Sequence, residues 1–133
     1  MRKGKEYRMK NIISSPKAPA AIGPYSQATE YNGIIFVSGQ LPINPATGAL
    51  CEGDIKEQTR VALTNISNIL EAAGSNLQKV LRTTVLLKDM GDFADVNEAY
   101  AEFFPAEPPA RVCYQVAALP KNARIEIAVT CIK

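Results

Sequence analysis

The segment PARVCYQVAALPKNARIEI, residues 109–127, decides how the rest of the chain is interpreted. It has the pattern of two apolar strands, 111–118 and 125–131, joined by a turn at 119–122, and we expect the two strands to be neighbours. Each strand carries a charged residue, Arg111 in the first and Glu126 in the second. Burying a charge without a partner is costly. The two side chains are therefore expected either to pair with each other or to face a polar cavity.

The length and composition predict one globular domain. The chain has 133 residues, of which 47% are hydrophobic and 21% are charged, and this is enough for one domain with a core and too little for two of typical size. No apolar run approaches the roughly 18 residues of a membrane span. The charged N-terminus has no apolar segment of a secretory signal behind it. We therefore expect a cytoplasmic protein with no membrane partner.

The net charge of +2 is concentrated at the N-terminus. Residues 1–10 hold five of the 15 Lys and Arg and one of the 13 Asp and Glu, which leaves ten basic and twelve acidic residues in the remainder. Nucleic-acid-binding proteins usually carry a basic face on the fold itself, so we expect no nucleic-acid partner. We interpret residues 1–8 as a basic N-terminal extension, either ordered or disordered, and residues 9–133 as the single domain.

The absence of histidine limits the chemistry. It removes Ser-His-Asp and Cys-His catalysis and His-ligated metals. The three cysteines, Cys51, Cys113 and Cys131, form no C-x-x-C pair, so neither a disulfide framework nor a metal site is expected. Any reaction must use Arg, Glu, Tyr, Ser, Asn, Cys and the backbone.

Periodicity and turn signals predict an α+β fold. Asp54 is the expected N-cap of a helix with apolar residues at helical spacing, which Gly74 ends. Asp92 is expected to cap a second helix, 93–104. The dipeptide Asn32-Gly33 predicts a hairpin. The predicted strands are 10–14, 26–31, 34–38, 80–88, 111–118 and 125–131. The order β-β-β-α-β-α-β-β indicates a mixed six-stranded sheet with two helices on one face.

Several predicted strands are apolar on both faces, for example 85–87. Two helices can cover only one face of such a sheet. We therefore expect the other face to pack against copies of the same chain in a homo-oligomer.

Six short motifs together are typical of one family. They are AIGPYSQ (21–27), SGQ (38–40), EAAG (71–74), DFADVN (92–97), PAR (109–111) and IEI (125–127). From about Met9 onward the chain resembles the RidA/YjgF family of enamine and imine deaminases. The resemblance implies a chorismate-mutase-like fold and a homotrimer with three clefts between subunits. It further implies hydrolysis of 2-aminoacrylate and 2-aminocrotonate, which pyridoxal-phosphate-dependent dehydratases release, to 2-keto acids and ammonia, without a cofactor.

The resemblance gives roles to three residues of the opening segment, each with a plainer alternative. Arg111 would clamp the substrate carboxylate with two parallel hydrogen bonds, or it is a structural ion-pair partner. Glu126 would position and deprotonate the attacking water, or it only neutralises Arg111. Cys113 shares the face of Arg111. It would bind substrate through its backbone, or it is a small core residue, or its thiol is activated by the nearby Arg.

Four further residues are placed at the cleft by the same resemblance. Tyr25 would form a lid-like wall, or it is a core aromatic. Ser38 and Gly39 would offer a hydroxyl and a backbone group to the substrate nitrogen, or they form only a bulge. Asn97 would lie at the cleft edge, or it bridges to a neighbouring strand. The predicted catalytic pair is thus Arg111 and Glu126, with these four residues and Cys113 binding substrate.

Two other functions remain open from the sequence. One is a non-catalytic trimer that binds small carboxylates or acts as a chaperone. The other is an endoribonuclease that inhibits translation, as some relatives of the family are described; the lack of histidine and the acidic body of the chain argue against it.

Overall fold

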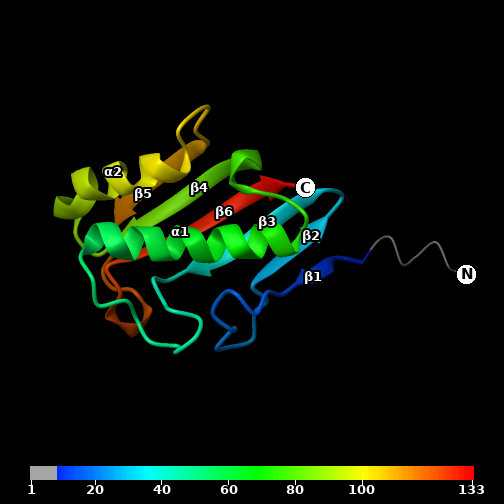
Figure 1. Cartoon of the computed structure of the whole chain (residues 1–133), viewed down its shortest axis with the longest axis horizontal. Helices are drawn as coiled ribbons and strands as arrows, with labels where there is room; N and C mark the ends of the chain where they lie inside the picture. The colour runs from blue at the N-terminus through cyan, green and yellow to red at the C-terminus, as the bar shows by residue number, and fades with distance from the viewer. Residues whose placement is uncertain (1–8) are drawn as a thin grey trace, which may run out of the picture.

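The computed structural model describes residues 9–133 as a six-stranded mixed sheet with two helices. The predicted extension, residues 1–8, lies outside the described residues. The elements are β1 (Asn11–Ile13), β2 (Ala28–Tyr31), β3 (Ile34–Gln40), α1 (Ile55–Ala72), β4 (Val80–Leu87), α2 (Phe93–Phe103), β5 (Ala110–Gln115) and β6 (Ile125–Ile132). The predicted α+β order is confirmed (Figure 1).

The predicted hairpin joins β2 to β3. Asn32 and Gly33 both adopt positive φ, 52° and 81°, as a two-residue type I′ turn requires. The strands on either side pair antiparallel, with Tyr31 opposite Ile34. A bulge then interrupts the pairing of β3 with β6 between Val37 and Gln40. The bulge confirms the irregularity that was one alternative for Ser38 and Gly39.

The strands of the opening segment are not neighbours, so that prediction is wrong. The sheet order is β1-β2-β3-β6-β4-β5, and β4 lies between β5 and β6. The chain leaves α2 and returns parallel to β4 along its outer side, so β5 becomes an edge strand. The last strand then enters the middle of the sheet, antiparallel to both β3 and β4. Its four inward side chains, Ile125, Ile127, Val129 and Cys131, are buried, and this favours a central position.

Helix α1 covers the centre of the sheet. Asp54 accepts a hydrogen bond from the backbone N–H of Glu57 at 2.9 Å, as predicted for an N-cap. The predicted apolar stripe is buried against the sheet from Ile55 to Leu70. Gly74, with φ of 82°, follows the helix. No helix within residues 9–133 is both long and apolar enough to cross a bilayer.

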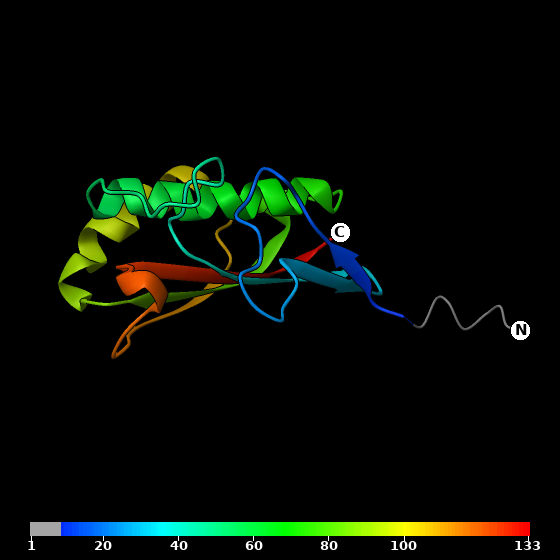
Figure 2. The same cartoon turned by 90° about the horizontal axis from the view of Figure 1, so that it is seen from below.

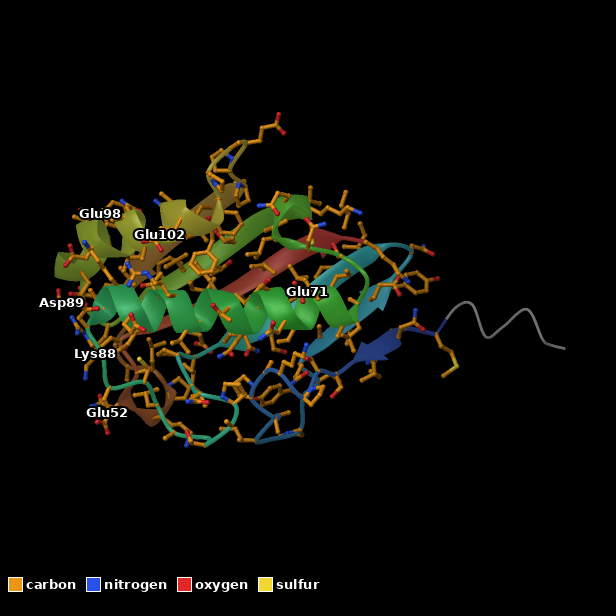
Figure 3. The ribbon with its side chains drawn as sticks, in the orientation of Figure 1. Glu52, Glu71, Lys88, Asp89, Glu98 and Glu102 are labelled. Atoms are coloured by element: carbon orange, nitrogen blue, oxygen red, sulfur yellow. The ribbon has the colours of Figure 1, made fainter. Side chains whose placement is uncertain are left out.

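Helix α2 packs beside α1, and ion pairs join the two. Glu98 and Glu102, labelled on α2 in Figure 3, pair with Lys56 at 2.7 Å and with Arg60 at 3.0 Å. The prediction that the Asp92 side chain caps α2 is wrong. Asp92 stands at the N-cap position without a capping hydrogen bond, because its carboxylate pairs with Arg124 at 2.9 Å.

Both helices lie on the same face of the sheet (Figure 2). The opposite face has no helix over it within residues 9–133, and we call it the open face. Its side chains include exposed apolar groups such as Phe36, Val112 and Tyr114. The outer edge of β5 pairs with no strand of the described chain. An apolar face beside a free strand edge is a surface suited to association with another copy.

We predict that the packing of α1 on the sheet supplies a large part of the stability. Leu63 is fully buried in the core, so Leu63→Ala is expected to lower the free energy of unfolding by about 2–5 kcal/mol. Thr64 is its exposed neighbour on the same helix, and Thr64→Ala is expected to change it by less than about 0.5 kcal/mol. Urea denaturation at one fixed protein concentration measures both. Equal effects of the two substitutions would contradict this account of the core.

Candidate active site

A cavity of about 550 Å³ lies at the bulge of β3 and contains the Glu126 side chain. The bulge residues Ser38 and Gly39 form one wall. Apolar side chains and the turn after β5 form the rest, among them Ile22, Leu41, Ile43 and Pro120, with Lys121 beside them. A mainly apolar cavity with few polar groups is the usual form of a small-molecule site.

Gly39 allows the Glu126 carboxyl group to lie against the backbone of β3. A Cβ atom at position 39 would come within 2.5 Å of Glu126 Oε2, so any other residue there would displace the carboxyl group. Burial raises the pKa of Glu126 above its ordinary value. A carboxylate whose pKa is raised accepts a proton more readily near neutral pH. Glu126 therefore has the properties of a general base.

Tyr25 and Ser38 lie at the same cavity as Glu126. Tyr25 is 49% exposed and its hydroxyl accepts a hydrogen bond from the backbone N–H of Ile22, so the alternative of a core aromatic is wrong. The Ser38 hydroxyl donates to the carbonyl of Ser26 at 2.6 Å. The structure thus brings together four of the predicted site residues: Tyr25, Ser38, Gly39 and Glu126. We call them the acid half-site.

Arg111 lies elsewhere, on the edge strand β5 and under α2. Its Nη1 donates to Asn97 Oδ1 at 2.8 Å, which confirms that Asn97 bridges to a neighbouring strand. The guanidinium carbon lies 4.9 Å from the centre of the Tyr100 ring and 5.5 Å from that of Phe93. Within residues 9–133 no carboxylate is within ion-pair distance of Arg111. The alternative of a structural ion pair with Glu126 is therefore wrong within one chain.

Cys113 is two residues from Arg111 on the same face of β5 and packs against the core. Burial raises the pKa of its thiol, and Arg111 offsets this effect only in part. Arg111 thus acts in the direction of the hypothesis and favours the thiolate, but burial outweighs it and leaves the pKa of the thiol above its ordinary value. Arg111, Asn97 and Cys113, with Phe93 and Tyr100, form what we call the arginine half-site.

The two half-sites of one chain lie on opposite faces of the sheet. Arg111 is paired in register with Thr83, which is buried under the helices. Glu126 is paired with Leu86, three residues further along β4, and side chains an odd number of residues apart point to opposite faces. One chain therefore cannot bring Arg111 and Glu126 to a common ligand.

The sequence interpretation missed Phe93, Tyr100 and Lys121. The spacing of Phe93, Asn97 and Tyr100 places them on one side of a helix and makes the two rings neighbours of Asn97, but it does not reveal that Arg111 lies over both rings. Lys121 gives no such signal, because its place at the cavity depends on the turn after β5. Within residues 9–133 no three Cys, Asp or Glu side chains cluster as the ligands of a metal would.

Comparison with known proteins gives consistent similarities over almost the whole chain. A family model described as Endoribonuclease L-PSP matches residues 15–133. A RutC family protein of Pyrococcus horikoshii is 54% identical over 90% of this chain and 94% of its own. The 2-iminobutanoate/2-iminopropanoate deaminase of Bos taurus is 52% identical over 90% of this chain and 87% of its own.

The fold is also similar to that of solved structures. The crystal structure of a putative endoribonuclease from Thermotoga maritima superimposes with a TM-score of 0.92 and 46% identity. The match covers 94% of this chain and 98% of that one.

We predict that the charge at position 97 controls the binding of anions at Arg111. Asn97→Asp would place a carboxylate on the guanidinium, where it competes with any ligand carboxylate. Affinity for pyruvate, measured by calorimetry, is expected to fall at least tenfold more in Asn97→Asp than in Asn97→Ala. If the two variants bind pyruvate equally well, Arg111 is not the receptor of the carboxylate.

Proposed function

The chain belongs to the family described as Endoribonuclease L-PSP, the RidA/YjgF family, and on this premise we propose that it is an enamine and imine deaminase. It hydrolyses 2-aminoacrylate, 2-aminocrotonate and their imine tautomers to 2-keto acids and ammonia. The relative from Bos taurus, which is 52% identical over almost its whole length, carries the name of this activity. The same reaction removes reactive intermediates before they damage other enzymes. A cytoplasmic location remains a prediction.

The observation that carries the proposal is that the Arg111 guanidinium is held in place and has no ion-pair partner within residues 9–133. Asn97 and two aromatic rings fix its guanidinium, and no carboxylate of the described chain neutralises it. A fixed guanidinium with free N–H groups matches a carboxylate by two parallel hydrogen bonds. Every proposed substrate carries such a carboxylate next to the carbon that reacts.

The complete site requires two copies of the chain. Arg111 lies on the face covered by the helices and Glu126 lies on the open face, so an arginine half-site must meet the acid half-site of another protomer. The exposed apolar side chains of the open face and the free edge of β5 support such an association. A homotrimer, in which three protomers close a ring, gives three equivalent sites.

In the proposed mechanism Arg111 of one protomer anchors the substrate carboxylate and so orients C2. The enamine takes up a proton at C3 and becomes the protonated imine. Glu126 of the other protomer removes a proton from water, and the oxygen attacks C2 to form a carbinolamine. Glu126 returns its proton to the nitrogen, the C–N bond breaks and ammonia leaves, and the hydroxyl group releases its proton as the 2-keto acid forms. Free imines hydrolyse in water, so orientation and one proton transfer supply the required acceleration.

We predict that Arg111 and Glu126 are both required for turnover. A dehydratase generates 2-aminoacrylate from serine, and lactate dehydrogenase follows the pyruvate formed. The wild type is expected to accelerate pyruvate release, and Arg111→Ala and Glu126→Gln are each expected to lose at least about 100-fold of that acceleration. Equal acceleration by wild type and Arg111→Ala would refute the assignment. Cleavage of RNA that depends on Arg111 would instead support the ribonuclease function.

We predict that these two inactive variants restore activity when they assemble together. A site between an Arg111→Ala protomer and a Glu126→Gln protomer can contain both intact groups. Random equimolar mixing by co-refolding is expected to recover about one quarter of the wild-type sites. The separately refolded variants, mixed afterwards without exchange of subunits, are the control. Recovery of no activity would show that each site is built within one chain.

A further inference from the structure

Arg111 uses little of its hydrogen-bonding capacity within the described chain. A guanidinium has five N–H donors, and the one hydrogen bond found from it within residues 9–133 goes to Asn97. A single hydrogen bond allows the side chain to rotate about it. Something besides Asn97 must therefore fix the plane in which a bidentate carboxylate is bound.

The Tyr100 ring supplies a surface for this purpose. It lies 4.9 Å from the guanidinium carbon, closer than the Phe93 ring at 5.5 Å, and both distances are within the range of cation–π attraction. Tyr100 is 7% exposed, and its ring packs 4.7 Å from that of Phe104 in the core. The ring beneath Arg111 thus belongs to the rigid interior.

The hydroxyl of Tyr100 ties this ring to the sheet. It lies 2.8 Å from the hydroxyl of Thr83, which is fully buried on β4. Thr83 is also the register partner of Arg111 across the β4–β5 ladder. The strand that fixes the backbone of Arg111 therefore also fixes, through Thr83 and Tyr100, the surface on which its guanidinium lies.

We infer that Thr83 and Tyr100 are positioning residues that orient Arg111 for the carboxylate of its ligand. The inference rests on the proposed function for the identity of that ligand, a 2-imino acid. Neither residue touches the substrate. Their contribution is to hold the free N–H groups of Arg111 in one plane, so that the cost of ordering the side chain is met before the ligand arrives.

The test compares Tyr100→Leu with Phe103→Leu, which removes a half-buried ring of the same helix that has no stacking contact with Tyr100 or Arg111 within residues 9–133. Binding of 2-oxobutanoate and of its uncharged methyl ester is measured by ligand-observed NMR, and KM and kcat by the coupled assay. Tyr100→Leu is expected to raise the Kd of 2-oxobutanoate and KM about tenfold, with kcat within about twofold and the Kd of the ester unchanged. Phe103→Leu is expected to leave both Kd values at the wild-type level, and Tyr100→Phe, which keeps the ring, to stay within about threefold of wild type.

The inference is overturned if Tyr100→Leu and Phe103→Leu weaken the binding of 2-oxobutanoate equally, if binding of the ester weakens as much as that of the acid, or if the wild type fails to bind the acid. Should Tyr100→Leu fail to fold, Thr83→Val carries the test, with an expected rise of about threefold in the Kd of the acid alone. No change in that Kd overturns the inference. Because binding needs no turnover, a wild type that binds 2-oxobutanoate without hydrolysing imines refutes the proposed function and leaves the comparison of Kd values decisive.

Discussion

The alternation of side chains along β-strands is the constraint on which the rest of this structure depends. It sends Arg111 to the face covered by the helices and Glu126 to the open face of the same sheet. A one-residue shift of β6 would reverse Glu126, and it would also turn the buried row from Ile125 to Cys131 toward the open face. The hydrophobic core thus fixes the separation of the two charged groups. The buried core and the proposed need for a second copy both follow from the alternation of side chains along the strands.

The two half-sites have different properties: Glu126 is suited to accept a proton, and Arg111 is suited to bind an anion. Glu126 lies in a largely apolar cavity, where burial raises its pKa and favours proton uptake. Arg111 keeps its charge on a bed of aromatic rings, with hydrogen-bond donors left over for an anion. An ion pair between the two groups would neutralise both and remove these properties, so in the proposed site the substrate lies between them. On separate faces, each is held ready for a substrate that carries a carboxylate beside its reacting carbon.

Much of the fold could be predicted from local patterns. The spacing of apolar residues in α1, the Asn32-Gly33 turn and the coverage of one face by two helices are properties of short segments or of simple counting. The position of β6 could not be predicted, because strand order depends on contacts between distant parts of the chain. The facing of Arg111 away from Glu126 and the raised pKa of the Cys113 thiol follow from that order and from the packing of α2. The periodicity of apolar residues in the sequence reveals neither the face on which Arg111 lies nor the pKa of the Cys113 thiol.

The free edge of β5 has a consequence for a newly made chain. Until it meets another copy, the protomer exposes unpaired backbone groups along this strand, next to the apolar side chains of Val112 and Tyr114. Such an edge can also pair with other extended chains. In the proposed assembly, slow encounters at low protein concentration would delay the formation of complete sites and prolong the exposure of this edge.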